Sequence, residues 1–238
     1  AFFFAHLSFA QVNLSYEFTQ SSATYVPLVG GTQIIAPNSD DTNSASVDIG
    51  FDFVHDNVTY TQFRANANGH IRLGGTANAT SSYTPISTAS NTGAIAFFGR
   101  DGRALGGVFT QLSGTAPNRV LTIEYTTFQL QYNVAGNTLN AQIRLFETTN
   151  AIELHYGSST TAVSYTGQVG IRGATTDATN FLNRTTASDW SATAAGTAST
   201  NSMTLSATVF PANGLIFKFK LAPPPVNPPT CASIFSPA

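Results

Sequence analysis

Apolar and polar residues alternate along much of the chain, most clearly in residues 139–157, LNAQIRLFETTNAIELHYG. Apolar residues fall on every second position of residues 139–145 and again of 152–156, on either side of a turn near Thr149-Asn150. Successive side chains of a strand point to opposite faces of its sheet. The segment therefore predicts two antiparallel strands that share one buried face.

The same alternation predicts strands through most of the sequence. They are expected near residues 13–19, 24–29, 46–55, 58–66, 69–74, 93–99, 105–112, 119–132, 138–148, 151–157, 166–173, 203–209 and 213–220. No amphipathic helical stretch of ten or more residues is visible. A single open sheet of this size would leave an apolar face bare, so two sheets must pack together. The predicted fold class is all-β, a two-sheet antiparallel β-sandwich of jelly-roll or lectin-like character.

Two long segments do not alternate cleanly. Residues 76–92 and 185–201 are rich in Ser, Thr and Ala, and they predict long loops or irregular edge strands. Long loops on a rigid sandwich commonly carry binding residues. These two segments are therefore the first places to search for a site.

Composition narrows the class of protein. The chain has 238 residues, 42% of them hydrophobic and 18 of them Phe, which argues against disorder. Only 9% are charged, well below the usual quarter or so, and the formal net charge is −2. The ten Lys and Arg are scattered, so nucleic acid is not an expected partner. No apolar run is long enough to predict a transmembrane segment.

The first ten residues suggest export. Residues 1–10, AFFFAHLSFA, are apolar and end in small residues that fit a signal-peptidase site, with Gln11 as the mature N-terminus. The alternative is a first strand or the remnant of a tag. A signal-peptide remnant predicts a protein that is extracellular or at the cell surface.

The other end predicts a multidomain protein. Residues 222–229, APPPVNPP, form a Pro-rich linker, which is stiff and extended because proline fixes φ. Residues 230–238, TCASIFSPA, resemble the truncated start of a following immunoglobulin-like or fibronectin-III-like domain. The single Cys, Cys231, lies there, so no disulfide is expected within the sandwich domain of residues 11–221.

Several segments in order resemble a known family. They are YEFTQSSATYVPLVGGT (16–32), IGFDFVHDNVTYTQFRANANGHIRLG (49–74), GTAPNRVLTIEY (114–125), LNAQIRLFETTNAIELHYG (139–157), VGIRG (169–173) and NGLIFKFK (213–220). Together they cover roughly residues 14–221 and resemble the N-terminal β-sandwich domain of large secreted surface proteins of Bacteroidota. Such proteins often carry fibronectin-III-like or immunoglobulin-like domains and a type IX sorting domain. The segment FETTNAIELHYG is also similar to nidogen-like extracellular domains.

These resemblances imply export and surface display, and they bring no agreed set of catalytic residues. The first function hypothesis is a non-catalytic adhesion or carbohydrate-binding module, with glycans or extracellular matrix and cell-surface components as partners. The second is a structural spacer or display module without a ligand of its own. The third is a polysaccharide-degrading domain.

Catalysis is not expected, because no catalytic constellation is visible. With a tight turn at residues 149–150, Glu153 pairs opposite Phe146 and diagonal to Arg144, while Glu147 points to the other face. Glycosidases commonly need two carboxylates that face one cleft. His55, His70 and His155 stand outside any recognisable motif.

A calcium site is the leading chemical hypothesis. The loop of residues 38–44, NSDDTNS, supplies oxygen ligands from Asn38, Asp40, Asp41 and Asn43, and Asp101 lies in a second acidic loop. Calcium takes six to eight oxygens from carboxylates, amides, carbonyls and water. The alternative is a solvated turn that uses Asp and Asn for conformational reasons.

A glycan site is the leading functional hypothesis. Sugars bind aromatic faces together with planar amide or guanidinium donors. The candidate residues lie in the two long loops and in a Gly-rich connection, and they are Trp190, Tyr83, Arg100, Asp101 and Arg103. The alternative for Trp190 is an anchor that packs against the sandwich, since large aromatic side chains are mostly buried.

Overall fold

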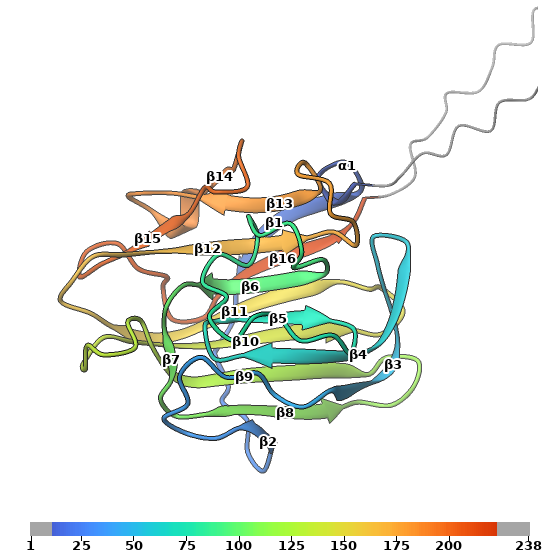
Figure 1. Cartoon of the computed structure of the whole chain (residues 1–238), viewed down its shortest axis with the longest axis horizontal. Helices are drawn as coiled ribbons and strands as arrows, with labels where there is room; N and C mark the ends of the chain where they lie inside the picture. The colour runs from blue at the N-terminus through green and yellow to red at the C-terminus, as the bar shows by residue number, and fades with distance from the viewer. Residues whose placement is uncertain (1–10, 223–238) are drawn as a thin grey trace, which may run out of the picture.

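A computed structural model describes residues 11–222 and confirms the two-sheet antiparallel sandwich (Figure 1). The predicted signal-peptide remnant at 1–10 and the predicted domain start at 230–238 lie outside the described residues, as does all of the 222–229 linker except its first residue. One four-residue helix, α1 (Val12–Ser15), and a 3-10 turn, η1 (Trp190–Ala192), are the helical elements within the described range.

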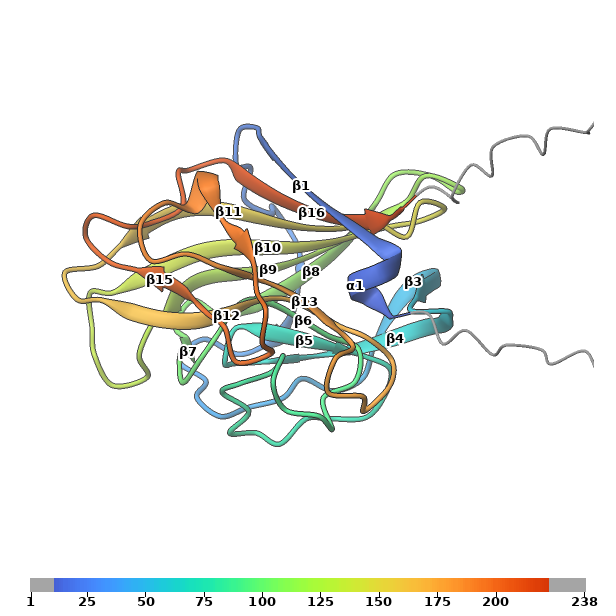
Figure 2. The ribbon, with the colours of Figure 1, turned by 90° about the horizontal axis from the view of Figure 1, so that it is seen from above.

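The first sheet, sheet A, has the order β1-β16-β11-β10-β9-β8-β2, and β7 also pairs with β9. Its strands are β1 (Tyr16–Ser22), β2 (Thr32–Ile35), β7 (Arg103–Ala104), β8 (Val108–Ser113), β9 (Val120–Gln129), β10 (Thr138–Phe146), β11 (Ile152–Thr160) and β16 (Leu215–Leu221). Strands β8 to β11 follow one another as hairpins. The two ends of the domain, β1 and β16, lie side by side at one edge of the sheet (Figure 2).

The second sheet, sheet B, has the order β14-β13-β12-β6-β5-β4-β3, and β15 also pairs with β12. Its strands are β3 (Val47–His55), β4 (Val58–Asn66), β5 (His70–Leu73), β6 (Ala94–Gly99), β12 (Tyr165–Arg172), β13 (Phe181–Thr185), β14 (Ala194–Ala195) and β15 (Met203–Leu205). The two sheets stack face to face with the core between them (Figure 2).

Strand β3 shows why these residues form a sandwich. Ile49, Phe51 and Phe53 are buried, and the intervening Asp48 and Asp52 are exposed, as the alternation predicts. The apolar face of β3 can leave water only by packing against the opposite sheet.

Two tyrosines of sheet A join the sheets through the core. The single proton of the Tyr125 hydroxyl is shared between the carbonyls of Asn66 and His70, and the Tyr156 hydroxyl donates to the carbonyl of Phe97 at 3.0 Å. All three acceptors belong to sheet B. A buried phenol needs a hydrogen-bond partner, so these bonds fix the register of one sheet against the other.

The register of the β10–β11 hairpin differs from the prediction. Glu153 lies directly opposite Arg144, and Ile152 opposite Leu145, so the expected pairing of residue 153 with 146 is wrong. The connection is wider than a tight turn because Thr148 and Asn150 both take left-handed backbone conformations, with φ of 66° and 51°.

The predicted strand at 24–29 is also wrong, because this segment pairs with no strand. It is part of the connection between β1 and β2, which lie on opposite edges of sheet A, so it must cross the outer face of that sheet (Figure 1). Within residues 11–222 no helix has the length and apolar character needed to span a membrane.

Candidate functional site

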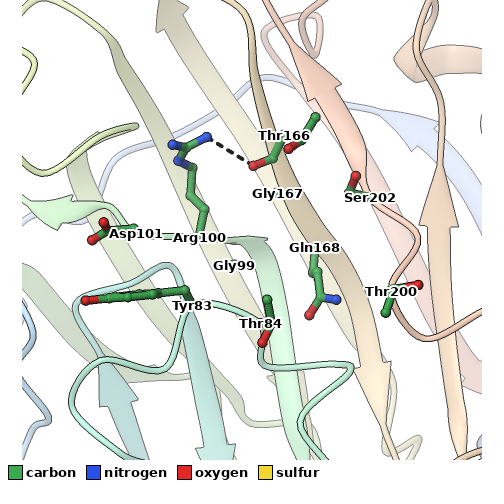
Figure 3. Close-up of a pocket in the computed structure, with 10 residues that line it drawn as sticks. All are labelled: Tyr83, Thr84, Gly99, Arg100, Asp101, Thr166, Gly167, Gln168, Thr200 and Ser202. Carbon is green, nitrogen blue, oxygen red and sulfur yellow. Dashed lines mark hydrogen bonds between the residues drawn. The ribbon is translucent and has the colours of Figure 1, made fainter.

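A cleft of about 270 Å³ opens at one end of the sandwich and gathers residues from four distant segments (Figure 3). It is lined by Tyr83, Thr84, Gly99, Arg100, Asp101, Thr166, Gly167, Gln168, Thr200 and Ser202. Three of the five predicted ligand residues, Tyr83, Arg100 and Asp101, therefore lie in one cleft. We refer to it as the Tyr83 cleft.

Arg100 is held rigidly at the edge of the Tyr83 cleft. Its Nη1 donates to the carbonyl of Thr166 at 3.0 Å and its Nη2 donates to Oε1 of Gln131. The guanidinium lies 4.5 Å from the centre of the Tyr165 ring, within cation–π range. Burial lowers the pKa of Arg100 from its usual value, and the group remains charged because arginine titrates far above neutrality.

The floor of the cleft is fixed by β12. Gln168 is buried, and its Oε1 accepts from the backbone N–H of Ile86 at 2.8 Å while its Nε2 donates to the carbonyl of Ser199 at 3.0 Å. This one side chain therefore joins the two long loops. Gly167 leaves no room for a side chain, because an added Cβ would lie 2.8 Å from the Phe98 ring.

The tyrosine of the cleft connects it to a group of carboxylates. The Tyr83 hydroxyl donates to Oδ2 of Asp41 at 2.9 Å. Asp41 in turn belongs to a cluster in which one carboxylate oxygen from each of Asp40, Asp41 and Asp101 lies within 4.8 Å of the others. The two candidate sites predicted separately, for a glycan and for calcium, thus adjoin and share Asp101.

Asn68 positions both acidic loops. Its Nδ2 donates to Oδ1 of Asp41 at 2.9 Å, and its Oδ1 accepts from the N–H of Gly102 at 3.1 Å, next to Asp101. The side chain is fully buried. A buried amide bonded on both sides holds the loops at a fixed separation.

The electrostatics of the cluster favour neutralisation. The pKa of Asp40 is raised by partial burial and by the charge of Asp41. The pKa of Asp101 is raised by partial burial and by the charges of Asp40 and Asp41. Like charges this close disfavour one another, so a proton or a bound cation would stabilise the cluster.

The other predicted metal ligands have different roles. The side chain of Asn43 bonds to Asn66 and to the carbonyl of Asn78, on the side of β4. Asn38 takes a left-handed conformation with φ of 63°, and its carbonyl accepts from Nε of Arg103 at 3.1 Å. The left-handed backbone therefore accounts for an asparagine at position 38. Arg103 stabilises this loop and does not line the Tyr83 cleft.

Trp190, one of the candidate glycan-binding residues, takes the alternative role of an anchor that packs against the sandwich. Trp190 is 1% exposed and packs between the sheets against Phe98, Tyr156 and Phe217. Its indole N–H donates to the carbonyl of Thr204 at 2.7 Å. The indole is large enough to fill the gap between the two sheets, so it serves as the anchor of the 185–201 loop.

The glutamates of the β10–β11 hairpin do not form an acid pair. Glu147 bonds to Arg119, whereas Glu153 bonds to Lys218 at 2.9 Å and to His155 at 2.8 Å. Arg144 lies opposite Glu153 on β10, but the ion pair with Glu153 is formed by Lys218 on the neighbouring strand β16. The two carboxylates therefore serve separate ion pairs.

The acidic cluster brings together the carboxylates of Asp40, Asp41 and Asp101, the three acidic residues named in the calcium hypothesis. Both oxygens of Asp41 are taken by Tyr83 and Asn68. Of the three carboxylates, Asp101 alone lines the Tyr83 cleft within the described residues. A glycosidic bond in the Tyr83 cleft would therefore have the carboxylate of Asp101 beside it, whereas glycosidases commonly use two carboxylates.

Several residues of the site escaped sequence reasoning. The bridging role of Asn68 depends on Asp41 and Gly102, which are distant in the sequence and approach it only in the folded chain. The role of Gln168 could not be predicted, since a glutamine in a strand of alternating apolar and polar residues is expected on the exposed face. Thr200 belongs to the Ser/Thr-rich stretch of residues 185–201 and Ser202 follows it, but composition does not indicate which side chains of such a stretch point into a cleft.

Comparison with known proteins identifies a family. A family model described as NIDO related matches residues 15–221, which is nearly the whole sandwich. No curated protein and no solved structure matches the chain. The similarity of residues 146–157 to nidogen-like domains points in the same direction. By the extent of this match, the chain belongs to the NIDO-related family.

Proposed function

We propose that this domain is an extracellular, non-catalytic recognition module that binds a glycan in the Tyr83 cleft. NIDO-related domains often occur as extracellular modules. The observation that carries the proposal is the convergence of Tyr83, Arg100 and Asp101 with hydroxyl residues from two long loops. The proposal extends to surface display on a larger protein of the Bacteroidota type, supported by the resemblance of residues 14–221.

The chemistry of the cleft suits a neutral polyol. Thr84, Thr166, Thr200 and Ser202 offer hydroxyl groups, and Asp101 offers a carboxylate acceptor. The ring of Tyr83 is partly exposed and lies along one wall (Figure 3). A sugar presents several hydroxyls beside an apolar ring face, and this wall can meet both.

Calcium would strengthen such a site if it binds the cluster. A cation at Asp40, Asp41 and Asp101 would relieve their repulsion and leave coordination positions open toward the cleft. Calcium binding at these residues remains a prediction, and the functional proposal does not depend on it.

A spacer or display module is the second candidate, and the burial of Trp190 favours it. The single Trp is committed to packing, so the cleft has Tyr83 as its aromatic wall. Many hydroxyl-bearing residues on the surface also suit a soluble spacer. The two candidates differ in whether the folded domain binds anything.

A glycan-array screen of the 238-residue chain, with about 5 mM Ca²⁺ or with EDTA, distinguishes them. The recognition proposal predicts reproducible binding to a small set of related glycans. Binding that needs calcium would place the acidic cluster in the site. A blank array from folded protein would overturn glycan recognition in favour of the spacer. Release of new reducing ends from a bound glycan would overturn the non-catalytic assignment.

A further inference from the structure

The connection between β1 and β2 covers part of the outer face of sheet A. We call residues 23–31 the strap. They leave β1 at one edge of the sheet and reach β2 at the other (Figure 1), and the strand order places β16, β11, β10, β9 and β8 between those two edges. The strap adds a second layer over a face that would otherwise be open to water.

The strap is held by polar side chains of the sheet. Glu124 is 4% exposed, and its two oxygens accept from the Tyr25 hydroxyl at 2.8 Å and from the Leu28 N–H at 2.9 Å. Gln142, opposite Glu124 on β10, donates to the carbonyl of Val26 at 2.8 Å. These bonds fix the height of the strap above the sheet.

A cavity of about 400 Å³ lies between the strap and the sheet. Its apolar walls are Val26, Pro27, Leu28, Val29, Val120 and Phe146, and its polar walls are Gln111, Ser113, Thr122 and Arg144. The volume is at the lower end of the range for small-molecule sites. We call it the strap cavity.

Arg144 is the one charged residue that lines the strap cavity in the described part of the chain. Its Nε and Nη2 both donate to Oε1 of Gln142, at 3.0 and 2.6 Å. Among residues 11–222, Nη1 has no acceptor. Glu153 lies opposite Arg144 but bonds to Lys218 and His155 instead. The guanidinium is therefore oriented by a neutral amide and keeps hydrogen-bonding capacity for an anion.

The rim of the cavity is unusually apolar. Val26 is 60% exposed and Val29 is 87% exposed, both on the strap. Covering an exposed valine with an apolar group of a ligand lowers the free energy of the complex, because apolar surface is removed from water. The cavity thus combines an oriented cation with an uncovered aliphatic rim.

We propose that the strap cavity binds a carboxylate attached to a branched aliphatic group, with the carboxylate on Arg144 and the aliphatic group against the strap valines. Two sources supply this chemistry, a free branched-chain acid and the C-terminal residue of a peptide. This site is separate from the Tyr83 cleft, and the two share no lining residue.

Backbone amide shifts recorded by NMR during titration test the proposal. The probes are 4-methylpentanoate for the free acid and N-acetyl-leucine for the peptide terminus, each at up to about 10 mM. N-acetyl-leucinamide is the matched control, since it lacks the carboxylate. We expect shifts confined to the strap and to residues near Gln111 and Thr122, with at least one acid and not with the amide. The tighter acid identifies the source. Equal binding of acid and amide, or no localised shift with either acid, would overturn the proposal.

Substitutions locate the two parts of the interaction. Arg144→Gln should weaken binding of the tighter acid about tenfold, since charge-assisted hydrogen bonds are lost. Lys220→Gln removes one positive charge from the same sheet and should leave the affinity unchanged. Val29→Ser, on an exposed strap position, should weaken binding about threefold and is safe for folding. Unchanged affinity in Arg144→Gln, or a loss equal to it in Lys220→Gln, would contradict the site.

Discussion

The Tyr83 hydroxyl donates a hydrogen bond of 2.9 Å to Asp41, and this contact joins the candidate glycan cleft to the acidic cluster. The bond raises the pKa of Tyr83 to about 12, with partial burial adding to the effect. Because Asp41 lies close to Asp40 and Asp101, a change of charge in the cluster alters the electrostatic environment of Tyr83 at the wall of the cleft.

The first prediction concerns this cluster. Asp101→Asn should raise the melting temperature in EDTA by about 1–3 °C, because it removes one of three mutually repelling carboxylates. In the wild type, about 5 mM Ca²⁺ should raise the melting temperature by about 2–5 °C, and the variant should lose most of that shift. Differential scanning fluorimetry measures both. Asp52→Asn, on an exposed position of β3, is the control. A wild-type melting temperature that is the same in calcium and in EDTA would refute the cation site.

The second prediction concerns the indole between the sheets. Trp190→Ala should lower the free energy of unfolding by about 3–5 kcal/mol, because a large buried ring is replaced by a cavity. Trp190→Phe should cost less, since it keeps an aromatic ring against Phe98, Tyr156 and Phe217 and loses mainly the bond to Thr204. Urea denaturation gives both values. A stability change below about 0.5 kcal/mol in Trp190→Ala would show that the residue is not an anchor.

The third prediction is a loss of stability in acid that depends on His70. This imidazole is fully buried, and burial lowers its pKa to about 4. The unfolded chain therefore binds a proton between about pH 6.5 and pH 4 while the folded protein does not, so stability falls as the pH drops through that window. His70 contributes at most about 1.4 kcal/mol per pH unit.

His70→Gln should reduce that slope. Urea denaturation at pH 7 and pH 5 compares the variant with the wild type. Asp40 and Asp101 act in the opposite direction because their pKa values are raised, so the difference between the two proteins is the informative quantity. Identical slopes would show that His70 does not titrate as its burial requires.

The fourth prediction concerns the strap. Glu124→Ala removes the acceptor for the Tyr25 hydroxyl and the Leu28 amide, so local opening of residues 23–31 should become easier. Hydrogen exchange at the Leu28 amide should become at least tenfold faster. Glu17→Ala, at an exposed position of β1, serves as the control and should leave that rate unchanged. An unaltered Leu28 rate in Glu124→Ala would mean that other contacts hold the strap.

The sequence predicted those parts of the fold that depend on local alternation. Strand β3 is an example, because the side on which Phe51 and Phe53 lie follows from the period of two. Residues 24–29, TYVPLV, also carry strand-forming side chains, yet they cross the sheet, since the edge positions of β1 and β2 are set by pairing at long range. Local pattern cannot distinguish a strand from an extended crossing segment.

The candidate site was predicted in part for the same reason. Tyr83, Asp101 and the 38–44 loop carry recognisable chemistry, but their meeting depends on Asn68 and on the packing of both sheets. The burial of Trp190 depends on Phe98 and Phe217, which are 92 and 27 residues away in the chain. Neither the meeting of the two loops nor the packing of Trp190 can be predicted from the residues adjacent to them in the sequence.

The most direct test of glycan recognition is to block the Tyr83 cleft. Thr200 is exposed at its rim, so Thr200→Tyr should fill the cleft without disturbing the core, and Thr59→Tyr places the same side chain on an exposed position of β4. The array signal of the best glycan should fall at least tenfold in Thr200→Tyr and stay at the wild-type level in Thr59→Tyr. Full binding by folded Thr200→Tyr would contradict the assignment of glycan recognition to this cleft.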